Sequence, residues 1–238
     1  MSEHLFAVLG GMGTLATENF IQELNRLSAA SKDQDYLNYV VYNKASIPDR
    51  TDYILDKNAP NPIPFLASGL QKLVAMEPDF IVMPCNTAHF FYDELAKSIN
   101  VPFLNMIDET VKELISRGAE QGMKIGIAAT EGTIKSKIYE DKLNEAGFDS
   151  YVPNKELQQI VNDLIYVDIK QNSDVNMPRY NKMVSYFEAE QCDYVVLGCT
   201  ELSIFNSYDQ KKRDNVVDAD DVLVRKTVEL ARQTQPLV

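Results

Sequence analysis

The sequence predicts an α/β protein built from two similar halves. Short runs of β-branched and aromatic residues alternate with longer segments in which apolar residues recur every three or four positions. Continuous apolar strands between amphipathic helices are typical of a parallel sheet covered by helices on both faces. A recurring combination of a strand followed by a cysteine indicates the division into halves.

The strands are expected where apolar runs are shortest and most continuous. These are Leu5–Leu9, Tyr39–Asn43, Phe80–Met83, Phe103–Met106, Lys124–Ala128, Tyr194–Leu197 and Asn215–Asp218. Helical spacing joins them, for example at Phe20, Leu24 and Leu27. The segment after Asp218 is strongly amphipathic, and we expect it to pack on the first half as a helix.

The internal repeat rests on two matched features in the same order. Phe80–Thr87 resembles Tyr194–Glu201, since each is a buried strand ending in a cysteine and small polar residues. Leu5–Thr14 also resembles Lys124–Thr133, since each is a strand running into a glycine and a threonine; Gly13 precedes Cys85 by 72 positions, and Gly132 precedes Cys199 by 67. We therefore expect two α/β domains, the first from residues 1–107 plus 218–238 and the second from 108–217.

Composition excludes several functional classes. The 238 residues carry 23 basic and 35 acidic side chains, a net charge of -12, which argues against binding a nucleic-acid backbone; only Lys211–Arg213 forms a short basic run. No apolar run approaches the roughly 20 residues of a membrane span, and Met1–His4 leads into too short an apolar stretch for a signal peptide. Three cysteines make no disulfide framework, which favours the cytoplasm, and two histidines exclude a multi-histidine metal site.

A glycine cluster follows the first strand. Gly10, Gly11 and Gly13, with Ala16, fit the G-x-G-x-x-A fingerprint of dinucleotide-binding proteins. The second strand ends in Asn43-Lys44 and supplies no acid for a ribose, so a nicotinamide cofactor is a minor alternative. A tight strand–helix turn, or a loop that cradles a small carboxylate, fits the glycines better.

The cysteines are more informative. Cys85 and Cys199 each follow the carboxyl end of an expected strand, the edge where open α/β sheets bind ligands. A helix that begins after each cysteine favours the thiolate. Because the two positions are equivalent in the two halves, their thiols could face one another across a cleft, one on each side of a carbon atom. Cys192, among polar neighbours, is expected to be a bystander.

Short polar residues accompany these thiols. Asn86, Thr87 and Thr200 offer amide and hydroxyl donors suited to a small anion. His89 is either a partner of Cys85 or an interior histidine bonded to backbone. Arg50 could bind a carboxylate through its guanidinium, although for Arg50 and Lys170 a solvated surface position is the default.

Four motifs together resemble the aspartate/glutamate racemase family. They are Leu9–Gly13, Ile47–Thr51, Pro84–His89 and Gly198–Leu202, in order along nearly the whole chain. The resemblance implies two pseudo-symmetric Rossmann-like domains, each with a parallel four-stranded sheet, and an active site in the cleft between them. It also implies a cofactor-independent enzyme, without pyridoxal phosphate or metal, that is a cytoplasmic homodimer.

The resemblance assigns roles by motif. Cys85 and Cys199 would be the paired acid and base. Arg50 and Lys170 would bind substrate carboxylates, and the remaining substrate-lining positions would be Met12, Gly13, Asn86, Thr87, Ala88, Thr200 and Glu201. Two departures stand out: Thr14 replaces a proline common after the glycine motif, and the segment after Asp218 lacks a histidine often found there.

The expected reaction is interconversion of L- and D-aspartate by proton transfer between two cysteines. A glutamate or broad-specificity racemase is an alternative, as is a maleate isomerase or a malonate decarboxylase on the same fold. A dicarboxylate-binding module without catalysis is a further alternative. The expected ligand in each case is a small amino acid or dicarboxylate.

Overall fold

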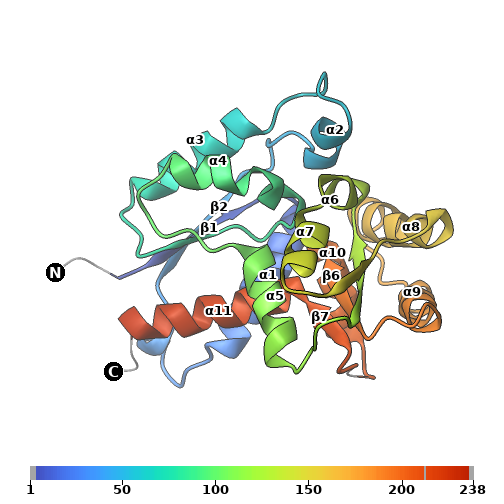
Figure 1. Cartoon of the computed structure of the whole chain (residues 1–238). Coiled ribbons are helices and arrows are strands. Elements are labelled where there is room, and N and C mark those ends of the chain that lie inside the picture. Colours follow the sequence, from blue (N-terminus) through green and yellow to red (C-terminus); the bar gives the residue numbers. More distant parts are fainter. Residues whose placement is uncertain (1–3, 212, 236–238) are drawn as a thin grey trace.

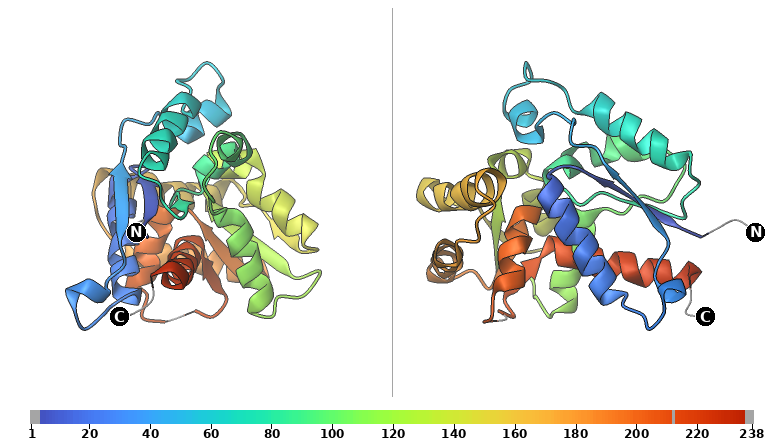
Figure 2. Two further views of the ribbon diagram at one scale, coloured as in Figure 1. Left: turned by 90° about the vertical axis from the view of Figure 1, so that its left-hand side faces the viewer. Right: turned by 180° about the vertical axis from the view of Figure 1, so that it is seen from behind.

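The computed structural model describes residues 4–211 and 213–235 (Figure 1). The start of the segment considered as a signal peptide, the middle of the short basic run and residues 236–238 lie outside the described residues. Two parallel sheets lie side by side with helices around them, and the last helix, α11, spans Ala219–Thr234 and runs across both (Figures 1 and 2). Among the described residues, no helix is long and apolar enough to cross a membrane.

The first sheet has three parallel strands, whereas the sequence predicted four. Its order is β2 (Tyr39–Asn43), β1 (Phe6–Gly10) and β3 (Ile81–Val82). The segment expected as a fourth strand, Phe103–Met106, pairs with the sheet only through one bridge between Ile81 and Phe103.

The hydrogen bonds around this bridge explain why no fourth strand forms. Ile81 donates its N–H to the Pro102 carbonyl and Leu104 donates to the Ile81 carbonyl, so pairing begins normally. Asn105 then caps a helix, because its side-chain oxygen accepts the N–H groups of Ile107 and Asp108. The backbone therefore turns into α5 (Met106–Ser116) before a second pair can form.

The second sheet has four parallel strands, as predicted. Its order is β5 (Asp149–Tyr151), β4 (Lys124–Ala129), β6 (Tyr194–Gly198) and β7 (Val216–Asp218). The sequence did not indicate β5, which is a three-residue edge strand with no apolar run. The order β2-β1-β3-Phe103 matches β5-β4-β6-β7, so the two halves are pseudo-symmetric.

Helices cover both faces of the sheets (Figure 2). Lys170 lies in a π-helical segment, Asp163–Gln171. Short 3₁₀ turns occupy Asp33–Asp35 and Thr87–Phe91. The remaining helices are α1 (Thr14–Leu27), α2 (Arg50–Leu55), α3 (Ile63–Val74), α4 (Tyr92–Lys97), α6 (Glu131–Ser136), α7 (Ile138–Glu145), α8 (Lys155–Asn162), α9 (Met177–Ala189) and α10 (Thr200–Tyr208).

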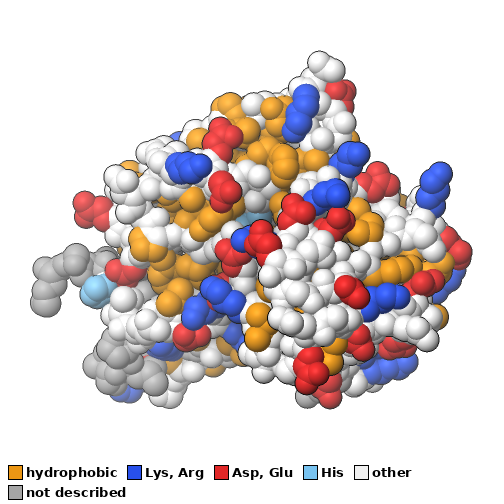
Figure 3. Space-filling model, viewed as in Figure 1, with side chains coloured by type: hydrophobic (Ala, Val, Ile, Leu, Met, Phe, Trp, Pro, Cys, Tyr) orange, Lys and Arg blue, Asp and Glu red, His pale blue; other side chains and the backbone are white. Residues whose placement is uncertain are grey.

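Hydrophobic packing joins the two halves. One cluster of buried side chains lies within each half, but a third contains residues of both sheets together with α5 and α11. Phe6 and Val8 of β1 and Ile125 and Ile127 of β4 belong to this shared cluster. On the face shown in Figure 3, hydrophobic side chains gather over α3 and α4, and charges of both signs are scattered over the rest.

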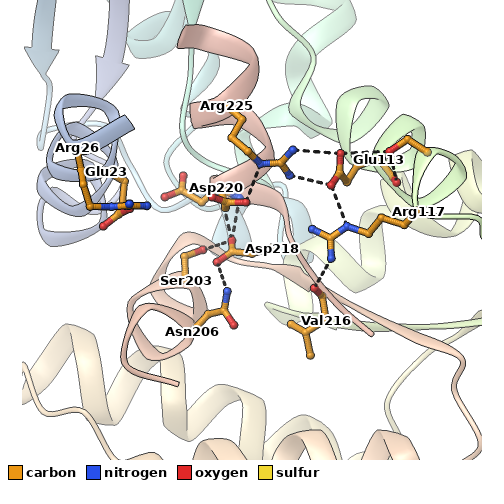
Figure 4. A network of polar contacts seen from close by, with 12 residues as sticks. Glu23, Arg26, Glu113, Arg117, Ser203, Asn206, Val216, Asp218, Asp220 and Arg225 are labelled. Carbon is orange, nitrogen blue, oxygen red and sulfur yellow. Dashed lines mark hydrogen bonds and ion pairs between the residues drawn. The ribbon is translucent and has the colours of Figure 1, made fainter. Parts of the chain in front are cut away.

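Asp218 connects β7 with α10 and α11 below the shared core (Figure 4). Its carboxylate accepts Ser203 Oγ at 2.5 Å and Asn206 Nδ2 at 3.0 Å, both from α10. It also caps α11 by accepting the N–H groups of Asp220 and Asp221. Burial raises the pKa of Asp218 to about 6, although the hydrogen bond from Ser203 opposes that shift.

We predict that Asp218 makes stability fall as pH rises from about 4 to 6. The folded pKa of about 6 lies above the unfolded value of 3.8, so the folded state binds more protons in that window. Asp218→Asn keeps an acceptor for the α11 cap and removes the titration. Urea unfolding should show the wild type losing about 1 kcal/mol more than the variant between pH 5 and 7. Equal losses in the two proteins would contradict the prediction.

Candidate functional site

A closed cavity lies where strands from both sheets end. Loops after β1, β2 and β3 meet loops after β4 and β6, and the π-helical segment completes the wall. The lining residues are Met12, Asp49, Arg50, Thr51, Cys85, Asn86, Thr87, Thr130, Tyr166, Lys170, Cys199, Thr200 and Glu201. The carboxyl ends of parallel strands thus place both expected thiols in one cavity.

Cys85 is held at the end of β3 by its own backbone. Its N–H donates to the Met83 carbonyl at 2.8 Å, and only 4% of the residue is exposed. Burial raises the pKa of the Cys85 thiol, while the Arg50 guanidinium and the Ala88 N–H act to lower it. A positive group therefore stands beside the first thiol.

Cys199 has different neighbours. It is the N-cap residue of α10, it is 5% exposed, and its Sγ donates to Oε2 of Glu201 at 2.9 Å. Burial and the Glu201 carboxylate raise the pKa of Cys199 well above its ordinary value, and Lys170 acts against them. An acidic group therefore stands beside the second thiol.

Lys170 reaches the cavity from the π-helical segment. Its Nζ lies 3.6 Å from Oε1 of Glu201 and 4.7 Å from the centre of the Tyr166 ring. Burial acts to lower the pKa of Lys170, but Glu201 and Cys199 outweigh it and raise the pKa. Lys170 therefore stays a cation, and its side chain, 28% exposed, reaches from the surface to the cavity lining.

Arg50, unlike Lys170, is buried rather than solvated. Its NH1 donates to the Pro48 carbonyl at 3.1 Å and its NH2 to the Met12 carbonyl at 3.3 Å, which ties α2 to the glycine loop. Among the described residues, Arg50 Nε and Asn86 Nδ2 are buried donors with no hydrogen-bond partner. Because both residues line the cavity, their free donors suit an anion such as a carboxylate.

Four threonine hydroxyls close the cavity across the two halves. Thr87 Oγ1 lies 3.0 Å from Thr130 Oγ1 and 2.9 Å from Thr133 Oγ1, and Thr51 Oγ1 donates to Thr130 at 3.3 Å. The remaining cavity volume is about 10 Å³, the space of one water molecule. A larger hollow of about 540 Å³ between α2, α6 and α8 contains neither thiol. The cavity as it stands is therefore too small to hold an amino acid.

The glycine loop serves close packing. A Cβ on Gly10 would lie 2.3 Å from Thr17 Cγ2, and Gly11, at φ +92°, lies against the Lys44 backbone. A Cβ on Gly13 would come within 3.3 Å of Glu201 Oε1. The loop thus brings the first half onto Glu201 of the second.

Other expected residues lie around the cavity in different roles. His89 is an interior histidine, since its Nδ1 bonds the Cys85 carbonyl at 2.9 Å and its Nε2 accepts the Met106 N–H at 3.1 Å. Cys192 is buried in the core of the second half, away from the cavity. Gly13 and Ala88 do not line the cavity, although Ala88 supplies its N–H to Cys85.

Sequence reasoning missed Asp49, Thr51, Thr130 and Tyr166 as lining residues. The internal repeat contained a signal for Thr130. When Gly132 is aligned with Gly13, Thr130 takes the position of Gly11 in the glycine loop of the first half. Within residues 4–211 and 213–235, no group of three His, Cys, Asp or Glu side chains is placed to hold a metal ion.

The chain is similar to known proteins along most of its length. The family described as Asp/Glu/Hydantoin racemase matches residues 9–227. A broad specificity amino-acid racemase, RacX of Bacillus subtilis (strain 168), is 31% identical over 229 residues, which are 94% of this chain and 96% of that protein. A glutamate racemase of Aquifex pyrophilus is 30% identical over 61% of this chain and 56% of its own length.

A solved structure extends the comparison to the fold. The aspartate racemase of Picrophilus torridus superimposes with a TM-score of 0.83 at 28% identity, over 99% of this chain and 96% of that one. The similarity therefore includes both halves and the cleft between them.

We predict that Gly132→Ala opens the cavity. A Cβ at Gly132 on α6 would lie 2.7 Å from Thr51 Cα on α2, a contact that forces the two helices apart. Overpacking of this kind costs about 1–3 kcal/mol, so alkylation of Cys85 and Cys199 by iodoacetamide should accelerate about tenfold or more. Lys135→Ala, on the exposed side of the same helix, is the control. Unchanged alkylation in a folded Gly132→Ala protein would show that this contact does not govern access.

Proposed function

The chain belongs to the Asp/Glu/hydantoin racemase family, and we propose that it interconverts L- and D-aspartate by proton transfer between Cys85 and Cys199. It is thus an amino-acid racemase, an isomerase. The observation that carries the proposal is the presence of both thiols in one cavity with two cations, the buried Arg50 and the partly exposed Lys170. Arg50 lies beside Cys85, and Lys170 lies beside the pair formed by Cys199 and Glu201.

The chemistry requires one base and one acid on opposite faces of the α-carbon. A thiolate removes the α-hydrogen, and the thiol across the cavity donates a proton to the other face. The first sulfur becomes a thiol and the second a thiolate, so charge is conserved within the pair. The protonation states of the two sulfurs are coupled and exchange at each turnover.

The carbanion must be stabilised by the protein's own donors, since the proposal includes no pyridoxal phosphate. Negative charge moves onto the α-carboxylate as an enediolate, and donors aimed at it lower the barrier by several kcal/mol. Asn86 Nδ2 is a buried donor without a partner at this place. The backbone N–H groups at the start of α10, after Cys199, add the positive end of a helix.

The second carboxylate of aspartate fits the remaining cations and hydroxyls. Arg50 Nε and the hydroxyls of Thr87 and Thr130 are donors near the first half of the site. Met12, Gly13, Ala88, Thr200 and Glu201 complete the proposed substrate surroundings that the family resemblance assigns. These local donors outweigh the net charge of -12 over the short distances in the cavity.

A racemase of broad specificity is the second candidate function. The relative from Bacillus subtilis has broad specificity by name, whereas the structural relative from Picrophilus torridus is an aspartate racemase. Two cations in one small cavity favour a dicarboxylic substrate over a neutral one. The proposed homodimer and cytoplasmic location stay predictions, and sedimentation of the purified chain tests the first.

We predict that the wild type exchanges the α-hydrogen of both aspartate enantiomers in heavy water and racemises them. Cys85→Ala and Cys199→Ala should each lose racemisation by a factor of about 10³ or more, since each removes one of two required proton carriers. NMR follows the exchange and chiral chromatography follows the racemisation. Cys192→Ala is the matched control and should stay active.

The same experiment separates the alternatives. Full racemisation in either site variant would refute the two-thiol assignment. A covalent adduct on one cysteine would favour an isomerase or decarboxylase of related fold. Binding of dicarboxylates without exchange would indicate a binding module.

We predict that Lys170→Met selectively weakens turnover of dicarboxylic amino acids. Loss of a charged hydrogen-bond donor to the substrate costs about 1.5–3 kcal/mol, so kcat/KM for aspartate should fall about 10- to 100-fold. Turnover of any neutral amino acid that the wild type accepts should change less. Lys112→Met, an exposed lysine on α5, is the control. Equal losses for acidic and neutral substrates would assign Lys170 to the chemistry rather than to specificity.

A further inference from the structure

The two thiols have unlike partners. Cys199 Sγ donates to Glu201 Oε2 at 2.9 Å, and that carboxylate is itself buried, with 2% of the residue exposed. Cys85 has no carboxylate hydrogen-bonded to it among the described residues; Arg50 is the cation that acts on it most strongly, and Lys170 acts on it less. The pseudo-symmetry of the halves therefore stops at the residues beside the sulfurs.

Glu201 is fixed where it stands by both halves. Its other oxygen, Oε1, lies 3.6 Å from Lys170 Nζ. Gly13 from the first half approaches the same oxygen so closely that a Cβ there would lie 3.3 Å away. With Oε1 directed toward Lys170, Oε2 is the oxygen that accepts the Cys199 proton.

We propose that Glu201 holds a proton on Cys199, so that Cys199 starts as the acid and Cys85 starts as the base. The inference rests on the proposed racemase function and assigns Glu201 an action on the thiol in addition to its expected contact with substrate. Removing the proton from Cys199 would leave a thiolate against a carboxylate at hydrogen-bond distance, which is costly in a buried site. Removing it from Cys85 leaves a thiolate beside a guanidinium.

The pKa directions agree with this geometry. Burial raises the pKa of both thiols. At Cys85, Arg50 opposes this rise more strongly than Glu201 adds to it, whereas at Cys199 Glu201 is the largest addition to the effect of burial. Lys170 acts to lower the pKa of Cys199 and only partly offsets the carboxylate. The other titratable groups that act on Cys199 or Glu201 are Arg50, Cys85, Tyr139, Tyr166 and Asp220.

The test measures the pH midpoint of alkylation for each cysteine, without substrate. Peptide mass spectrometry follows the modification, and a protease that cuts before aspartate separates Cys192 from Cys199 at Asp193. In the wild type, Cys85 should react with a lower midpoint than Cys199. Glu201→Gln should lower the Cys199 midpoint by about one to two pH units and change the Cys85 midpoint less.

Two further variants make the test specific. Glu201→Asp keeps the carboxylate and should leave the order of the two midpoints intact. Glu190→Gln neutralises a carboxylate that acts on Cys192, and it should leave Cys85 and Cys199 unchanged. Equal midpoints for Cys85 and Cys199 in the wild type, or an unchanged Cys199 midpoint in Glu201→Gln, would overturn the inference.

Turnover separates this inference from the proposed function. With aspartate, the high-pH limb of the rate profile should move to lower pH in Glu201→Gln, in step with the Cys199 midpoint. Because the equilibrium constant between the two enantiomers is one, kcat/KM must be the same for both in every variant. Any difference between the enantiomers that Glu201→Gln causes therefore appears in kcat and KM separately. The cysteine midpoints could shift as expected while the wild type shows no turnover of aspartate. That outcome would refute the racemase function and leave the proton-holding role of Glu201 intact.

Discussion

The shared hydrophobic cluster between the two sheets is the constraint on which the site depends. It fixes β1 and β4 side by side through Phe6, Val8, Ile125 and Ile127, with α5 and α11 packed against both. Because all strands in each sheet are parallel, the loops that bear the functional groups lie at one edge of each sheet. The shared core turns these two edges toward one cavity, and neither half forms that cavity alone.

Charge in this cavity is balanced between neighbouring groups. Two thiols, a carboxylate, a guanidinium and an ammonium group lie within a space that water can barely enter. Each would be costly if buried alone, so the structure pairs them: Arg50 acts on Cys85, and Lys170 acts on Glu201. The same pairing gives the two sulfurs different affinities for a proton, which a reaction with one acid and one base requires.

Closure of the cavity follows from packing between the halves. The threonine hydroxyls and the approach of Gly132 to Thr51 join α2 to α6 over the thiols. These contacts are polar and local, whereas the core below is large and apolar. We therefore expect the halves to separate at the hydroxyls, with the core intact, when a ligand enters the cavity.

The sequence by itself determined the α/β class, the two halves and the pairing of Cys85 with Cys199, because apolar periodicity and repeated motifs are local properties of the chain. It could not determine that the segment at Phe103 makes only one bridge to the sheet, since helix capping by Asn105 competes there with strand pairing. Nor could it place Arg50 and Lys170 in the cavity rather than at the surface without the family resemblance, or separate the surroundings of the two thiols. Only the tertiary structure decided that Glu201 meets Cys199 and that hydroxyls from both halves close the site, because these contacts join residues whose proximity depends on how the two sheets pack.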